Sequence, residues 1–153
     1  MIKLSEEVID FFKRQSFIIV VTRDAKGSLH CSCKGIVKIN RDGKVYLLDL
    51  YKKRTFENLK NDKNISIIAV DEHKFIGYCL KGRAQIISAQ DFDQELNLAW
   101  EESITKRITQ RVIRNLKQES GHSSHPEASF PRPQYLILMD INEVVDLTPH
   151  HLK

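Results

Sequence analysis

The chain has 153 residues, of which 41% are hydrophobic and 29% charged, and its formal net charge is +4. This length matches one ordinary domain, and the composition is typical of a folded globular chain. No apolar stretch approaches the roughly 18 residues of a membrane-spanning helix, and residues 1–15 lack the apolar core of a signal peptide. Three cysteines without disulfide-type spacing fit a reducing compartment. We therefore expect a single cytoplasmic domain over 1–153 with no membrane partner.

The first two-thirds of the chain predict one helix followed mainly by strands. Ser5 precedes Glu6 and Glu7, and this order favours a helix start, since serine caps free amides and acids complement the helix dipole. The helix is expected over 5–15. β-Branched and aromatic runs separated by turns such as Asp42-Gly43 then predict strands. These strands cover 17–22, 28–39, 44–50, 65–70, 75–87 and, at the end of the chain, 135–147, with a short helix between the third and fourth.

The second predicted strand alternates in polarity. Leu29, Cys31 and Cys33 are expected on its core side, with the cysteines acting as small hydrophobes. A zinc site is not expected, because structural zinc favours C-x-x-C pairs on turns and Cys79 supplies no second pair. In the fifth strand, Gly77 and Gly82 predict bends or bulges.

Helical patterns replace the strands after residue 88. Ser88 and Asp91 have the spacing of a capping box, and apolar residues recur at helical spacing from Phe92 to Leu116. Basic residues lie opposite the second half of this pattern. No aromatic residue interleaves with them, so we interpret them as a solvated face and expect no nucleic acid. The basic residues of this predicted solvated face are Lys106, Arg107, Arg111, Arg114 and Lys117.

A long segment rich in serine and proline, 119–134, follows this helical region. Loops of this length are often functional or disordered. His122 and His125 form a His-x-x-His pair within it. We interpret the pair as solvent-exposed rather than metal-binding, and a haem-binding role stays open as an alternative.

The order of the elements favours the α+β class. Consecutive strands linked by hairpins close small antiparallel barrels, whereas a parallel doubly wound sheet needs a helix after nearly every strand. The sequence therefore predicts a mainly β barrel with helices, in which 89–134 form a helical insert and loop.

The segment "YKKRTFENLKNDKN" (51–64) is the strongest candidate for a ligand site. Lys52, Lys53 and Arg54 follow a strand end and precede a helix start, where free amides and the helix dipole attract anions. Thr55 either caps this helix or offers its hydroxyl to the same anion. Together these residues predict a phosphate site, and a solvated basic turn is the alternative. Neither a Walker pattern nor Gly-x-Gly-x-x-Gly is present in the chain.

The ordered segments "FIIVVTRDAKGSLHCSCKGIVKINRDGKVYLLDLYKKRTFENLKNDKNISIIAV" and "LKGRAQII" resemble the FMN-binding split β-barrel family, which includes the pyridoxamine phosphate oxidase-like proteins and small FMN-binding proteins. The resemblance covers about 5–88 and extends to the last strand. It implies a six-stranded antiparallel split barrel that binds FMN at the interface of a homodimer. The residues it assigns to the cofactor are Ser32, Cys33, Lys34, Gly35, Leu48, Asp49, Lys53, Arg54 and Thr55.

Two departures from the family limit the functional prediction. Thr55 replaces the usual lysine of the phosphate turn, and the C-terminal arginine and histidine segment of the true oxidases is missing, so oxidation of vitamin B6 is not expected. No titratable residue stands out as a catalytic acid or base. The long loop favours an FMN-dependent oxidoreductase acting on a small molecule. There are two alternatives. The first is a flavin-storing or electron-carrying protein without its own substrate, and the second is a protein that binds haem or a deazaflavin.

Overall fold

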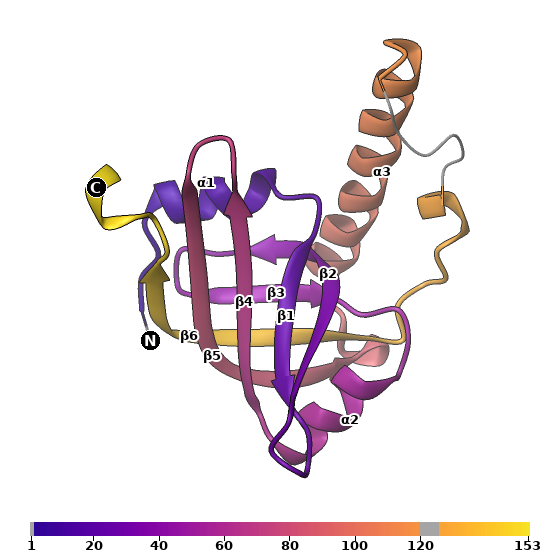
Figure 1. Ribbon diagram of the computed structural model, residues 1–153. Coiled ribbons are helices and arrows are strands. Elements are labelled where there is room, and N and C mark those ends of the chain that lie inside the picture. The colour runs from indigo at the N-terminus through magenta and orange to yellow at the C-terminus, as the bar shows by residue number, and fades with distance from the viewer. Residues whose placement is uncertain (1, 120–125) are drawn as a thin grey trace.

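The computed structural model describes residues 2–119 and 126–153. Six strands close into a barrel in the order β1-β2-β3-β6-β5-β4, and each neighbouring pair is antiparallel (Figure 1). The predicted α+β class and six-stranded antiparallel barrel are therefore confirmed. The helices and strands are α1 (Glu6–Arg14), β1 (Ile18–Arg23), β2 (Leu29–Ile39), β3 (Lys44–Leu48), α2 (Arg54–Asn61), β4 (Asn64–Asp71), β5 (Ile76–Ser88), α3 (Gln94–Leu116) and β6 (Tyr135–Asp146), with short 3-10 turns at Ala89–Asp91, Pro126–Ser129 and His150–Leu152.

Helix α1 lies across one end of the barrel (Figure 1). As predicted, Ser5 caps it, with the Oγ atom accepting a hydrogen bond from the Val8 amide at 3.3 Å. Ile9, Phe11 and Phe12 are buried on its inner side and belong to the main core cluster. The amphipathic pattern of the first 15 residues thus closes one end of the barrel.

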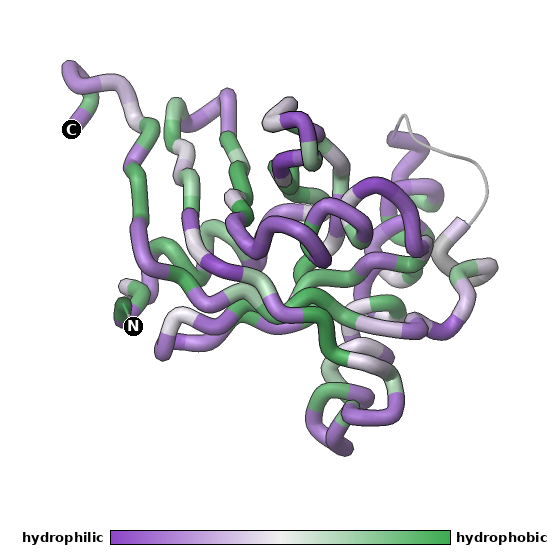
Figure 2. The backbone as a smooth tube through the Cα atoms, turned by 90° about the horizontal axis from the view of Figure 1, so that it is seen from below, coloured by the Kyte–Doolittle hydropathy of each residue, from purple (hydrophilic) through white to green (hydrophobic). Residues whose placement is uncertain are grey.

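The interior of the barrel is mainly apolar. Hydrophobic stretches run along the strands, and hydrophilic residues prevail at the turns between them (Figure 2). Burial of these side chains is the main favourable contribution to folding. The side chains that are completely buried include Val20, Val45, Leu47, Ile67, Leu80, Ile137 and Met139.

Strand β2 differs from its predicted orientation. Leu29, Cys31 and Cys33 are exposed, so the prediction that they face the core is wrong. The register with β3 shifts between Ile36 and Lys38, and a shift of one residue moves the side chains to the opposite face of a strand. One alternation therefore cannot hold along the whole strand.

The glycines of β5 have different roles. The β5–β6 register shifts between Lys81 and Gly82, so the predicted bulge at Gly82 is confirmed. A Cβ atom at this position would overlap the carbonyl oxygen of Asp140. Gly77, by contrast, lies in regular pairing with Val70.

Helix α3 starts later than predicted. Its N-cap is Asp93, whose Oδ1 accepts from the Leu96 amide at 2.7 Å, whereas Ser88 precedes a 3-10 turn and makes no side-chain cap. The first half of the helix packs on the barrel through Leu96, Trp100 and Ile104. These three side chains belong to the same hydrophobic cluster as Leu48 and Leu136. Its second half projects beyond the barrel (Figure 1).

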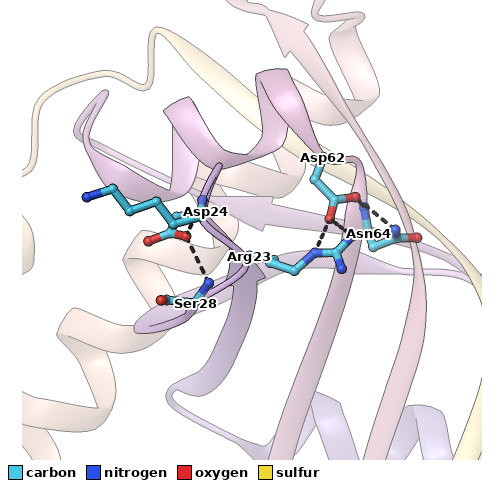
Figure 3. Close-up of polar contacts among 6 residues, drawn as sticks. Arg23, Asp24, Ser28, Asp62 and Asn64 are labelled. Atoms are coloured by element: carbon cyan, nitrogen blue, oxygen red, sulfur yellow. Dashed lines mark hydrogen bonds and ion pairs between the residues drawn. The ribbon is translucent and has the colours of Figure 1, made fainter.

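The β1–β2 turn is held by a small polar network (Figure 3). Asp24 accepts from the amide of Ser28 at 2.9 Å, and Arg23 forms an ion pair with Asp62 at 2.7 Å. The Asn64 amide and the Arg23 guanidinium lower the pKa of Asp62 below its usual value. This network ties the β1–β2 hairpin to the end of α2.

His122 and His125 lie outside the described residues. Within the described part of the chain, no helix is both long and apolar enough to cross a membrane.

Candidate functional site

Buried polar side chains gather where β1, β2 and β3 meet α2. A buried polar group is costly unless it is hydrogen-bonded, so such a cluster marks either a structural network or a ligand site. All five polar or charged side chains found buried in the described residues belong to this region. They are Thr22, Lys34, Asp49, Thr55 and Asn58.

An ionic network forms the centre of the cluster. The Lys34 Nζ atom on β2 lies 2.8 Å from the Asp49 carboxylate, which follows β3, and both side chains are buried. The Tyr135 hydroxyl at the start of β6 donates a short hydrogen bond to the same carboxylate. Burial and this hydrogen bond raise the pKa of Tyr135 well above its usual value. Asp49 is therefore held between a cation and a phenol that keeps its proton.

Hydroxyl groups join β2 and β1 to helix α2. The Ser32 Oγ and Thr55 Oγ1 atoms lie 3.1 Å apart, and the Asn58 amide donates to the Thr22 hydroxyl at 3.0 Å. Thr55 is the second residue of α2 and is buried, so it does not cap the helix. Its hydroxyl instead lies beside the Ser32 hydroxyl of β2, and the other predicted role, binding an anion, stays a prediction.

The basic turn lies at the N-terminus of α2. Lys53 is the N-cap residue and makes no side-chain cap, so this helix start relies on other groups to satisfy its first amides. Arg54 and Lys53 are exposed, and the Lys53 Nζ atom lies 5.5 Å from the centre of the Tyr51 ring. A helix start flanked by cations and hydroxyls has the chemistry of an anion site.

Gly35 and Cys33, two further predicted site residues, both belong to β2 but lie outside the ionic network. Gly35 pairs directly with Leu48 across β2 and β3, and the Arg107 guanidinium of α3 occupies the space where a Gly35 Cβ atom would lie. Cys33 lies next to Lys34 on the same strand but points away from the ionic network, because neighbouring side chains of a strand face opposite sides. The structure thus brings Ser32 to Thr55 and Lys34 to Asp49, and separates Cys33 from them.

Three residues of this region are absent from the predicted site. Tyr135 donates to the predicted residue Asp49, and Asn58 donates to Thr22 on β1. Arg107 lies against Gly35 and donates to the Ser16 carbonyl oxygen at 2.8 Å. Arg107 had been interpreted as part of a solvated face, which is wrong for this residue because it turns toward the barrel. No local signal identifies Tyr135, which meets Asp49 across 86 residues of sequence.

The donor set fits a phosphorylated organic ligand better than a metal ion. Lys53, Arg54 and the start of α2 are cationic or donor groups, while the only carboxylate of the cluster, Asp49, is already bonded to Lys34 and Tyr135. Among the residues that the structure describes, no three His, Cys, Asp or Glu side chains gather as metal ligands do.

Comparison with known families identifies the chain. The family model described as pyridoxamine 5'-phosphate oxidase matches residues 4–128, which span most of the sequence. The chain belongs to the pyridoxamine 5'-phosphate oxidase family. The resemblance seen in the sequence is thereby confirmed at the level of the family and its split-barrel fold.

Solved structures share this fold at low sequence identity. HupZ of Group A Streptococcus aligns with a TM-score of 0.67 and 18% identity over 95% of this chain and 94% of its own. A protein related to general stress protein 26, from Clostridium acetobutylicum, aligns with a TM-score of 0.61 and 16% identity over 96% and 95%. HutZ, a heme storage protein from Vibrio cholerae, aligns with a TM-score of 0.54 and 16% identity over 94% of each chain. No curated protein matches the chain.

Proposed function

We propose that this protein binds FMN, with the phosphate at the N-terminus of α2, and that it is an oxidoreductase acting on a small molecule. The observation that carries the proposal is the pair of Ser32 and Thr55 hydroxyls, 3.1 Å apart, beside the basic start of α2. Hydroxyls, exposed cations and helix amides together are the donors that a phosphate monoester takes up. When bound, the flavin supplies the redox chemistry.

A homodimer would complete the site. The outer face of β1, β2 and β4 is apolar, with Ile19, Leu29 and Val70 exposed, and Cys33 lies directly opposite Ile19. Exposed apolar patches on a sheet mark association surfaces. We infer that a second copy covers this face and that the flavin ring lies at its edge, which gives Cys33 its place beside the cofactor.

Two other functions use the same fold. A flavin carrier without its own substrate would need the phosphate site but no substrate pocket. A haem-binding protein would need none of the three cations of the turn, and HutZ is described as a heme storage protein. The basic turn favours the phosphorylated cofactor over haem. A cytoplasmic location is part of the proposal, since the three cysteines are free thiols.

The absorbance spectrum of the purified protein is the first test. We expect the two near-ultraviolet and blue bands of an oxidised flavin, which bleach when a nicotinamide donor is added without oxygen. A haem Soret band would replace the FMN proposal with the haem function. Flavin bands that neither NADH nor NADPH bleaches would favour the carrier.

A further inference from the structure

The side of α3 that faces the barrel changes character along the helix. Leu96, Trp100 and Ile104 pack in the apolar cluster on the barrel, and residues three or four positions further along a helix continue the same side. The next residues on this side are Arg107 and Arg111, and both are half-buried. Arginines therefore replace apolar residues on the inward side where the helix leaves the barrel.

A hollow of about 320 Å³ lies between this half of α3 and the connection from α1 to β1. Its lining consists of three arginines, two amide side chains, one serine and one phenylalanine, and none of these described residues is acidic. The residues that line this hollow, which we call the arginine hollow, are Ser16, Phe17, Arg107, Gln110, Arg111, Arg114 and Asn115. A concave wall that carries one sign of charge concentrates the electrostatic field and attracts ions of the opposite sign.

The spacing of the arginines suits two phosphate groups that are joined to each other. Arg107, Arg111 and Arg114 are four and three residues apart, which is about 6 Å and 4.5 Å along the helix axis at the usual rise. The planar guanidinium group binds phosphate through two parallel hydrogen bonds. Neighbouring phosphates of one ligand can therefore each meet an arginine of the same helix.

The size of the hollow favours a small molecule over a polymer. Sites for small molecules usually measure about 300–1,000 Å³. A groove for single-stranded nucleic acid needs aromatic side chains on which successive bases stack. Phe17 is the one aromatic residue of this described lining, and its ring already faces the Arg107 guanidinium, 5.0 Å from the ring centre.

Arg107 connects the arginine hollow to the proposed cofactor site. Its guanidinium group lies where a Gly35 Cβ atom would be, and it donates to the Ser16 carbonyl oxygen at 2.8 Å. Gly35 belongs to the segment that the family resemblance assigns to the cofactor. A larger hollow of about 810 Å³, between α1, β2 and α3, shares Ser16, Arg107 and Gln110 with the arginine hollow. An elongated ligand therefore has room along both hollows.

We propose that the arginine hollow binds the pyrophosphate group of a nicotinamide dinucleotide, the electron donor for the flavin. This inference rests on the proposed function, because it assigns the donor of that same redox site. The chain lacks Gly-x-Gly-x-x-Gly, so the donor phosphates need side chains to bind them, and the hollow supplies three arginines. In the step that this binding serves, one hydride leaves the dihydronicotinamide and, with one proton from solvent, reduces the flavin. Two electrons are transferred, and the oxidised nicotinamide is released.

Titration of the apoprotein with ADP-ribose tests the phosphate site without the flavin. ADP-ribose contains the pyrophosphate of the donor but no nicotinamide. By calorimetry, we expect Arg111→Gln/Arg114→Gln to bind it at least roughly tenfold more weakly than the wild type, because hydrogen bonds to charged groups are lost. The matched control Lys26→Gln/Lys74→Gln removes two exposed cations outside the hollow and should bind like the wild type. Equal weakening in both double variants, or no binding of ADP-ribose to the wild type, would overturn the proposal.

Flavin binding and flavin reduction are measured on the same variants. FMN affinity should be equal in the wild type and Arg111→Gln/Arg114→Gln, because neither arginine belongs to the phosphate turn before α2. The arginine variant should need roughly tenfold more NADH or NADPH for half-maximal bleaching of the flavin, with an unchanged rate at saturation. If the wild type binds FMN but neither nucleotide reduces it, the donor assignment is wrong. If FMN does not bind, the proposed function fails, and the ADP-ribose titration still decides whether the hollow is a phosphate site.

Discussion

The Lys34 ammonium group lies 2.8 Å from the Asp49 carboxylate, and both side chains are almost entirely shielded from solvent. Removing one partner of such a pair leaves an uncompensated buried charge, which typically costs about 3–5 kcal/mol. We expect Asp49→Ala to lower the free energy of unfolding by an amount in this range, measured by denaturant titration.

The matched controls for this pair are one surface pair and one double variant. Lys81 and Glu143 lie 3.0 Å apart but are about half exposed, so Glu143→Ala should cost less than about 1 kcal/mol. The double change Lys34→Met/Asp49→Leu should recover part of the loss, because no charge remains buried. Equal losses for Asp49→Ala and Glu143→Ala would contradict the role given to the buried pair.

Tyr135 predicts a loss of stability in alkaline solution. Burial, together with the hydrogen bond to Asp49, raises its pKa in the folded protein. The unfolded chain releases this proton near pH ~10, so the stabilising contribution is complete below that pH and is lost as the pH rises further. Between about pH 9.5 and 11.5, the wild type should lose stability more steeply than Tyr135→Phe. Tyr51→Phe, at an exposed tyrosine, should follow the wild-type slope.

Arg54 is expected to bind the FMN phosphate directly. Because a hydrogen bond to a charged group contributes roughly 1.5–3 kcal/mol, Arg54→Ala should weaken FMN binding by about this amount in a fluorescence titration. Lys60→Ala removes the same charge from the other end of α2, where the Lys60 side chain is exposed and lies 3.3 Å from the Glu57 carboxylate. If Arg54→Ala and Lys60→Ala bind FMN equally well, the turn does not hold the phosphate.

Replacing a glycine by alanine should lower the stability by an amount that depends on which atoms the new methyl group contacts, and Gly82 and Gly35 differ in this respect. In Gly82→Ala the Cβ atom would overlap the Asp140 carbonyl oxygen, so backbone must move, and overpacking of this kind typically costs about 1–3 kcal/mol. In Gly35→Ala the Cβ atom meets the flexible end of Arg107, which can swing aside. A thermal melt should therefore show a larger loss for Gly82→Ala than for Gly35→Ala. The reverse order would indicate that the Arg107 contact is the more rigid of the two.

Much of the fold follows from local patterns. The Ser5 cap, the Asp-Gly turn and the runs of β-branched residues are short-range signals, and they predicted all six strands and the first two helices to within a few residues. The start of α3 was missed because Ser88, with Asp91 three residues later, has the spacing of a capping box, whereas in the structure Ser88 starts only a 3-10 turn and Asp93 caps the helix. The facing of β2 was missed because the register shift after Ile36 depends on β3 rather than on β2 alone.

The candidate site was predictable only in part. Four residues taken from the resemblance lie in contact, Ser32 with Thr55 and Lys34 with Asp49, while their binding of a cofactor stays a prediction. Tyr135 could not be predicted, because its hydroxyl meets Asp49 only after the barrel has closed. Long-range contacts of this kind are set by topology and leave no periodic trace in the sequence.

A titration of the apoprotein with FMN and with riboflavin tests the central proposal most directly. The two flavins share the ring and the ribityl chain and differ only in the phosphate. If Lys53, Arg54, Thr55 and the start of α2 hold that phosphate, FMN should bind at least tenfold more tightly than riboflavin, which corresponds to about 1.4 kcal/mol. Equal affinities, or no binding of either flavin, would contradict the proposed cofactor site.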